Sequence, residues 1–120
     1  MRTLHRDVSA ISRRLGIRRA DLGGIRSVRG DIQLYLTSGG VPVAPLTLPA
    51  DHLADGLGAD CILVRDYGDH RGLARVLEAA GIAQAVSRSR AGGAPVVVMC
   101  LAACLLAKLP AARVERKVAA

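Results

Sequence analysis

A run of fourteen uncharged residues near the C-terminus constrains the fold of this chain more than any other feature. Residues 94–107 read APVVVMCLAACLLA. A membrane-spanning helix needs about twenty apolar residues, and the run reaches that length only by including Lys108 and Pro110. Pro95 followed by three valines is instead typical of the start of a strand. We therefore predict a core strand over residues 95–101 that leads into a helix; the alternative is a membrane-associated segment over residues 94–112.

The N-terminal segment predicts an amphipathic helix over residues 3–16. Its apolar residues recur four, three and four positions apart, which places them on one helical face: Leu4, Val8, Ile11 and Leu15. Thr3 can cap the first turn. Gly16 can end the helix in the left-handed conformation, with Ile17 folding back onto it.

A β-hairpin is predicted after an ambiguous segment. Residues 18–30 read either as a second helix, which their glycine pair weakens, or as a short strand over residues 24–29. Residues 31–37 then alternate apolar and polar side chains, residues 38–40 supply a turn, and residues 41–48 return. Three prolines place the returning strand at a sheet edge: Pro42, Pro45 and Pro49.

Two strand–helix units are predicted in the second half. Residues 61–64 read as a buried strand, and the helix after it, which Gly81 ends, has four regularly spaced apolar residues: Leu73, Val76, Leu77 and Ala80. Residues 50–57 predict a short helix, and residues 87–93 a flexible basic loop. The order predicts one α/β or α+β domain over residues 1–120. Its parts are an N-terminal helix, a β-hairpin, two strand–helix units forming a mixed sheet of about four strands, and a flexible or helical basic tail at 111–120.

Positive charge gathers at the two ends of the sequence. Residues 1–30 carry eight arginines and two aspartates, whereas residues 86–120 carry four arginines, two lysines and one glutamate. The segment between them is net acidic. Arginine supplies most of the basic residues, and guanidinium groups grip phosphate oxygens two at a time. This distribution indicates that both ends meet an anionic partner; the alternative is that the charges serve solubility.

Residues 11–29 resemble a helix-turn-helix motif. Within them, SRRLGIRRADL contains an apolar–Gly–apolar turn, and Leu22 and Ile25 would face inward from a second helix. The resemblance implies that the following hairpin acts as a wing and that duplex DNA is the partner. It also implies a binding surface of four arginines, two for the major groove and two for phosphate: Arg18 and Arg19, then Arg13 and Arg14.

The element order also resembles the core of small restriction-nuclease-like folds. If residues 24–29 form a strand, Asp31 takes the place of the metal-binding aspartate of that family. The partner motif, an acid and a lysine one residue apart, is missing because residues 41–48 carry no charge. Metal-dependent cleavage needs more than one acidic ligand. We therefore expect no active nuclease of this type and no metal site, while an inactive relative that still binds DNA stays open.

The segment DYGDHR, residues 66–71, contains the candidate catalytic residues. It follows a predicted strand and opens a predicted helix, the position at which α/β sheets bind ligands. An Asp–His pair there can act as orienter and general base on an anionic substrate: Asp66, Asp69 and His70. The alternative is structural, with Asp69 as the N-cap of the helix.

The basic loop predicted at residues 87–93 is a second candidate for phosphate contacts. Backbone N–H groups and two guanidinium groups, those of Arg88 and Arg90, could wrap a phosphate there. The loop lacks the Gly-Lys-Ser/Thr ending of a Walker loop. A plain solvated connector is the alternative.

The cysteines and the N-terminus indicate a reducing compartment. Cys61, Cys100 and Cys104 are odd in number and lie in apolar runs, so we expect neither a disulfide framework nor a zinc site. The first seven residues contain no apolar stretch of a secretory signal. We expect a cytoplasmic protein without a cofactor.

We therefore predict a small basic nucleic-acid-binding protein that grips duplex DNA through its arginine-rich ends. With two Tyr and no Phe or Trp, a reader of single strands is disfavoured, because such proteins stack bases on aromatic rings. One alternative is an α/β enzyme acting on an anionic substrate at Asp66, Asp69 and His70. The other is a homo-oligomeric assembly module that docks through the proline-bearing strand edge or the apolar C-terminal run.

Overall fold

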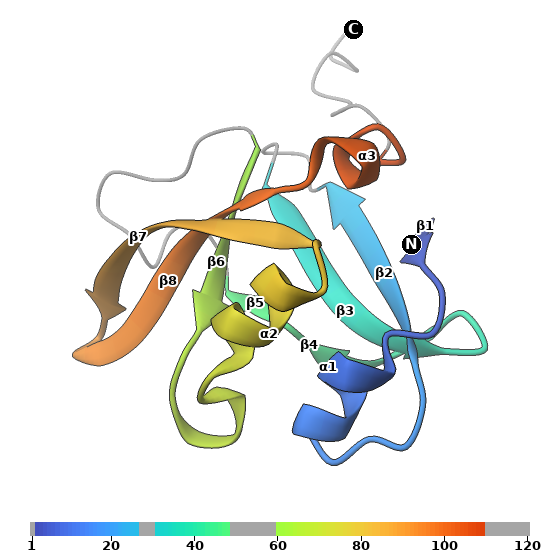
Figure 1. The fold of residues 1–120 in the computed structure, drawn as a ribbon, viewed down its shortest axis with the longest axis horizontal. Helices are drawn as coiled ribbons and strands as arrows, with labels where there is room; N and C mark the ends of the chain where they lie inside the picture. The colour runs from blue at the N-terminus through green and yellow to red at the C-terminus, as the bar shows by residue number, and fades with distance from the viewer. Residues whose placement is uncertain (1, 27–30, 49–59, 110–120) are drawn as a thin grey trace, which may run out of the picture.

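Two antiparallel four-stranded sheets make up most of the structure, a computed structural model that describes residues 2–26, 31–48 and 60–109 (Figure 1). The first sheet has the order β1-β2-β3-β4, with β1 (Arg2–His5), β2 (Asp21–Arg26), β3 (Ile32–Ser38) and β4 (Val41–Pro45). The second has the order β5-β6-β8-β7, with β5 (Thr47–Leu48), β6 (Cys61–Arg65), β7 (Ala83–Ala91) and β8 (Ala94–Leu101). The helical segments are short: α1 (Ser9–Arg14), the 3-10 turn η2 (Gly68–His70), α2 (Leu73–Ala79) and α3 (Ala103–Leu106).

The predicted α/β fold with a mixed sheet is wrong, because all strand pairings among the described residues are antiparallel. Tight turns join β3 to β4 and β7 to β8 directly, whereas parallel neighbours need a crossover connection of about a dozen residues or more. The element order behind the resemblance to restriction-nuclease-like folds is therefore not the order of this chain.

The N-terminal helix is shorter than predicted, because the chain first forms β1. This strand pairs with β2 and buries Leu4, which reaches the core from a sheet and not from a helical stripe. Asp7, with φ of +54°, separates the strand from α1. The predicted end of the helix is confirmed: Gly16 has φ of +74°, and Ile17 N donates to Ser12 O at 2.8 Å. These are the features of a glycine-terminated Schellman motif.

The helix-turn-helix interpretation is wrong, because the segment after α1 becomes a strand. Residues Asp21–Arg26 form β2, between β1 and β3, which is the strand alternative for this region. At Gly24, an added Cβ would lie 2.6 Å from Leu4 Cδ1, so only glycine lets β1 pack this closely. Arg18 and Arg19 consequently lie in the turn before β2 and not on a recognition helix.

The predicted hairpin is confirmed as β3 and β4, but its returning strand ends at Pro45, and Thr47–Leu48 pairs with β6 in the second sheet. Its turn residues Gly39 and Gly40 have φ of +59° and +83°, as a two-residue turn between twisted strands requires. β4 is the edge strand of the first sheet, as its prolines predicted, and Val41 and Val43 are exposed on it. β3 alternates as expected, with three residues buried in the core: Ile32, Leu34 and Leu36.

The apolar run near the C-terminus is confirmed as a core strand. β8 lies between β6 and β7, and its Val97 and Met99 are fully buried. The helix predicted after it is only the single turn of α3. In the part of the chain that the structure describes, no helix is long and apolar enough to cross a membrane. The predicted strand at residues 61–64 is β6, and the helix that Gly81 ends is α2.

The segment predicted as a basic loop, residues 87–93, is mostly strand. β7 pairs with β8 through to Ala91, and only Gly92 and Gly93, both with positive φ, form the turn. β7 is an edge strand, and its residues 86–90 are all exposed. Its sequence therefore lacks the alternation of apolar and polar residues by which a half-buried strand is recognised.

One core joins the two sheets, and the chain passes between them after β4. Leu46 N donates to Leu34 O at 2.9 Å just before β5 begins. α1 and α2 lie side by side, with α2 packed on β7 and β6 (Figure 1). At the other end of the described chain, Lys108 Nζ donates to Leu4 O at 3.0 Å, which ties the C-terminal segment to β1. The helix predicted at residues 50–57 and the tail at 111–120 lie outside the described residues.

We expect Gly24→Ala to lower the free energy of unfolding by about 1–3 kcal/mol, the usual cost of overpacking. The new methyl group would lie 2.6 Å from Leu4 Cδ1 and 3.1 Å from Leu109 Cδ2. Leu4→Ala removes the nearer obstacle, so the double variant should lose less stability than the two single losses predict. Urea unfolding of the three variants measures this coupling. Fully additive losses would contradict the packing of β1 against β2.

Candidate anion-binding groove

A groove of about 580 Å³ lies between α1, α2 and β7. Three arginines from these three elements line it: Arg14, Arg75 and Arg88. Among the described residues that line it, Asp66 is the only acidic side chain, and the residues other than the arginines are small or apolar: Ala10, Gly72, Ala74, Val76, Ala79 and Ala80. Three guanidinium groups against one carboxylate leave an excess of positive charge among these residues, and we call this feature the arginine groove.

Arg14 is held over the start of α2 by the backbone of the loop before it. Its Nε donates to Arg71 O at 2.9 Å, and its Nη2 donates to the same oxygen. A Cβ added at Gly72, which has φ of +82°, would lie 2.6 Å from Arg14 Nη2. The positive φ favours glycine at this position, and an added Cβ would displace the Arg14 guanidinium, which is the end of a flexible side chain.

Asp66 connects three elements around the groove. It follows β6, and its Oδ1 accepts a hydrogen bond from Gly72 N, the N-cap of α2, at 2.7 Å. Its Oδ2 pairs with Arg88 Nη1 of β7 at 3.2 Å. The Asp66 side chain is 18% exposed and that of Arg88 is 68% exposed, so the carboxylate is part of the framework while the guanidinium stays open to solvent.

The two arginines predicted on the basic loop lie on one face of β7. Arg88 is opposite Val97 and Arg90 is opposite Pro95 in the pairing with β8. Arg90 Nη1 also donates to Gly93 O at 2.5 Å, across the turn. Arg88 therefore lines the groove. Arg90 lies two residues further along the same face of β7, closer to the turn.

The other three predicted arginines lie outside the groove lining. Arg13 is exposed on α1, and its Nε donates to Ser9 O at 3.3 Å. Arg18 is exposed in the turn before β2. Arg19 lines a separate depression of about 360 Å³ and pairs with Asp7, with 3.8 Å between Nη2 and Oδ2. Of the four arginines that the helix-turn-helix resemblance implied, only Arg14 reaches the groove.

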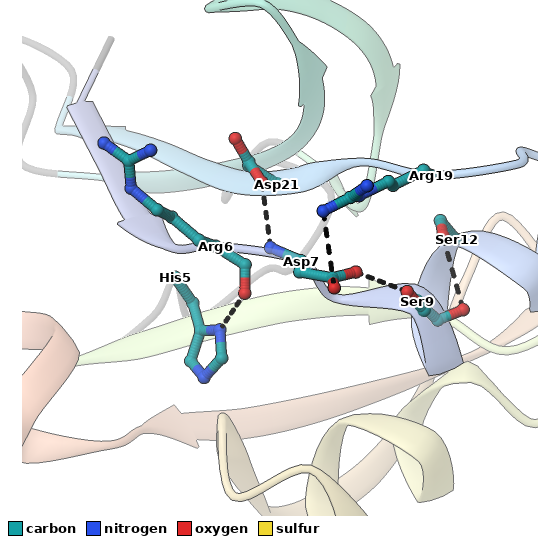
Figure 2. Close-up of polar contacts among 7 residues, drawn as sticks. All are labelled: His5, Arg6, Asp7, Ser9, Ser12, Arg19 and Asp21. Atoms are coloured by element: carbon teal, nitrogen blue, oxygen red, sulfur yellow. Dashed lines mark hydrogen bonds and ion pairs between the residues drawn. The ribbon is translucent and has the colours of Figure 1, made fainter.

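Figure 2 shows that Asp7 organises this second cluster. Its backbone N donates to Asp21 Oδ1 at 2.8 Å, which links the end of β1 to the start of β2. Its carboxylate accepts a hydrogen bond from Ser9 Oγ in the first turn of α1 and lies near Arg19. These contacts hold the positive φ of Asp7 and connect elements of the first sheet to α1.

The three candidate catalytic residues have separate environments. His70 is 9% exposed, and its Nε2 lies 3.3 Å from Arg65 Nη2. Asp66 instead binds Gly72 N and Arg88. Asp69 lines a neighbouring depression of about 540 Å³. It does not cap α2, whose N-cap is Gly72. These contacts favour structural roles for Asp66 and His70.

Burial lowers the pKa of His70 below its ordinary value of 6.5, and the positive charge of Arg65 lowers it further. A backbone hydrogen bond to Pro45 and the charge of Asp69 act in the opposite direction and are weaker. The fold therefore favours the neutral form of His70 over the charged form.

Arg75 is the groove residue that we did not predict from the sequence. It projects from α2 into the groove, is exposed, and has no hydrogen bond or ion pair within the described residues. The apolar spacing of the predicted helix did contain a signal. That spacing puts Leu73, Val76 and Leu77 on the buried face and leaves Arg75 on the other. Which element faces Arg75 is decided only by tertiary packing.

Comparison of the chain with protein-family models, with curated proteins and with solved structures found no match in any of the three.

We expect Asp66→Ala to lower the free energy of unfolding by about 1–3 kcal/mol, because it leaves the partly buried Gly72 N–H without its acceptor. Asp66→Asn keeps an oxygen acceptor and should lose less. Asp69→Ala is the matched control. Because Asp69 is exposed, this substitution should change the free energy of unfolding by no more than about 0.5 kcal/mol. Urea unfolding compares the three. Equal losses at Asp66 and Asp69 would rule out the role of Asp66 in the framework.

The lowered pKa of His70 predicts a loss of stability in mild acid. Because the folded protein holds His70 below its ordinary pKa of 6.5, the unfolded chain binds the proton more readily as the pH falls through that value. The stabilising effect is complete above about pH 6.5 and is lost as the pH decreases toward the folded pKa. His70→Gln, which does not titrate, should flatten this part of the pH dependence in urea unfolding. An unchanged slope would mean that another group causes the loss.

Proposed function

We propose that this protein binds duplex DNA by phosphate contacts along the arginine groove and the adjoining β7–β8 hairpin. One observation carries the proposal: Arg14, from the basic N-terminal segment, and Arg88, from the basic C-terminal segment, line the same groove. Arg75 of α2, which lies between these two segments in the sequence, lines the same groove. Basic residues that are far apart in the sequence are thus gathered on one surface, as a polyanion site requires.

The internal contacts of these arginines leave them able to bind an anion. A guanidinium has five N–H donors in a fixed fork. Arg88 uses Nη1 on Asp66, and Arg14 uses Nε and Nη2 on one carbonyl. The remaining donors are available, and side chains that are already oriented lose less conformational freedom on binding than mobile ones do.

The β7–β8 hairpin adds a shape that fits a duplex. Its closed end projects beyond β6, away from the first sheet (Figure 1), and residues 86–90 of β7 are exposed. A two-stranded antiparallel ribbon fits the major groove of B-form DNA. Arg88 and Arg90 share one face of this ribbon, and Ser87 and Ser89 share the other, so the ribbon offers donors on both sides.

A titration of a labelled duplex at several salt concentrations tests the proposal. Each neutralised phosphate contributes about −0.9 to the slope of log affinity against log salt. Contacts by Arg14, Arg75, Arg88 and Arg90 therefore predict a slope of about −3 to −4. Absence of binding in low salt, or an affinity that does not respond to salt, would reject duplex binding.

A charge-matched pair of variants locates the surface. Arg75→Ala and Arg19→Ala each remove one positive charge, but only Arg75 lines the arginine groove. Arg75→Ala should weaken binding equally for different duplex sequences and reduce the salt slope by about 1. Arg19→Ala should change both much less, because Arg19 lines a separate depression outside the arginine groove. Equal effects would place the contact surface elsewhere or spread it over the whole protein.

A small anionic ligand is a second candidate for the same groove. The apolar walls formed by Ala10, Ala74 and Val76 and a volume of about 580 Å³ fit the small-molecule sites of ~300–1,000 Å³ found in proteins. Such a ligand would combine a phosphate or carboxylate with a small apolar group. In a thermal-shift experiment it would raise the melting temperature of the wild type and not of Arg75→Ala, whereas duplex DNA would have no measurable affinity.

Assembly through the proline-bearing strand stays a further prediction. Val41 and Val43 are 61% and 49% exposed on β4, an edge strand with two prolines that lack N–H donors for a new pairing. The apolar C-terminal run is a less suitable docking element, because β8 lies inside the second sheet. The mass of the protein in solution distinguishes a monomer from a homo-oligomer.

A further inference from the structure

Two of the three cysteines lie directly opposite each other on neighbouring strands. Cys61 of β6 pairs in register with Cys100 of β8. The hydrogen bonds on either side define the type of pair, because Leu101 N donates to Asp60 O at 2.9 Å. Asp60 and Leu101 thus form a hydrogen-bonded pair, and such pairs alternate along an antiparallel ladder. Cys61 and Cys100, one step along, form a non-hydrogen-bonded pair.

The other end of the same ladder leads to the same assignment. Asp66 N donates to Pro95 O at 3.2 Å, so Asp66 and Pro95 also form a hydrogen-bonded pair. Hydrogen-bonded pairs therefore recur at every second residue, at positions 60, 62, 64 and 66, and Cys61 lies between two of them. Residues of a non-hydrogen-bonded pair have Cα atoms about 4.5 Å apart and side chains on the same face of the sheet. Disulfides join cysteines whose Cα atoms are about 4.4–6.8 Å apart. The ladder therefore places the two thiols where a disulfide forms without movement of the strands.

The position of the pair also makes it accessible. Ile62 and Met99, the next pair along the ladder, are fully buried in the core, so Cys61 and Cys100 face the other side of the sheet. Both are half-buried, and Cys100 lines a depression of about 530 Å³ together with Gln84 of the edge strand. A small reagent can therefore reach Cys100.

We propose that Cys61 and Cys100 form a reversible redox pair that closes to a disulfide across β6 and β8. All three cysteines are thiols in this structure. The oxidant is a low-molecular-weight disulfide. The Cys100 thiolate attacks one of its sulfurs and forms a mixed disulfide, and the first small thiolate leaves. The Cys61 thiolate then attacks Cys100 Sγ and expels the second small thiolate. The two protein thiols are oxidised, one small disulfide is reduced to two thiols, and the protein's two protons remain with them.

Closure would have a defined physical consequence. The bond links two strands of the second sheet through a long loop that includes α2, η2 and β7, which restricts the unfolded chain more than the folded one. The oxidised protein should therefore melt at a higher temperature than the reduced protein. The proposal does not depend on nucleic-acid binding, because the described residues that line the arginine groove include neither cysteine.

The test is oxidation of the reduced, folded full-length chain with oxidised glutathione, followed by peptide mapping under non-reducing conditions. We expect a peptide in which Cys61 is linked to Cys100, no glutathione on either of these residues whether or not the exposed Cys104 carries one, a higher melting temperature, and full reversal by dithiothreitol. Stable glutathione adducts on both residues, unreacted thiols at both, or linkage of either one to Cys104 would overturn the proposal.

Single variants distinguish a pair from independent thiols. Cys104→Ser is the control, since Cys104 is exposed on α3, and it should form the bond as the wild type does. Cys61→Ser lacks the second thiol, so it should retain one glutathione on Cys100 and show no rise in melting temperature. A rise equal to that of the wild type would contradict the cross-strand bond. If Cys61→Ser does not fold, the peptide map of the wild type still decides between the outcomes.

Discussion

The carboxylate of Asp66 is the contact on which the architecture of the arginine groove depends. One oxygen receives the N–H that begins α2, and the other pairs with Arg88 of β7. A single side chain at the end of β6 thus fixes the start of the helix and the direction of a neighbouring arginine. Arg14 reaches the same place from α1 because Gly72 leaves room for its guanidinium. Without this carboxylate, Arg88 would lose its ion-pair partner and Gly72 N, at the start of α2, would lose its acceptor.

The same local design occurs in both halves of the chain. Each half has a strand, an Arg-Asp pair, a short helix and a Gly-Ile pair before the next strand: Arg6-Asp7 and Gly16-Ile17, then Arg65-Asp66 and Gly81-Ile82. Both helices end with the same hydrogen bond, in which the isoleucine N–H donates to the carbonyl oxygen five residues earlier: Ile17 N to Ser12 O and Ile82 N to Leu77 O. Their partners differ: the Asp7 carboxylate accepts from Ser9 Oγ of α1 and lies near Arg19, whereas the Asp66 carboxylate accepts from Gly72 N and pairs with Arg88 of β7.

The errors of sequence reading arose where local pattern and long-range pairing compete. Leu4 fits a helical stripe, but it is buried by pairing of β1 with β2, and Gly24 removes the side chain that would block that contact. Residues 87–91 resemble a loop because an edge strand with exposed faces needs no apolar alternation. In both cases the structure of the segment depends on the strand with which it pairs. Neither that strand nor the pairing register can be read from the local sequence.

The sequence by itself determined the local structures whose physics is contained in a few neighbouring residues. These include the glycine ends of both helices, the Gly39-Gly40 hairpin turn, the proline edge strand and the buried β8. It also determined an excess of positive charge at both ends. Only the tertiary structure decided that Arg14, Arg75 and Arg88 share one groove and that Cys61 lies opposite Cys100. Such neighbours depend on strand order and register, which are set by the burial of the whole core and not by any single segment.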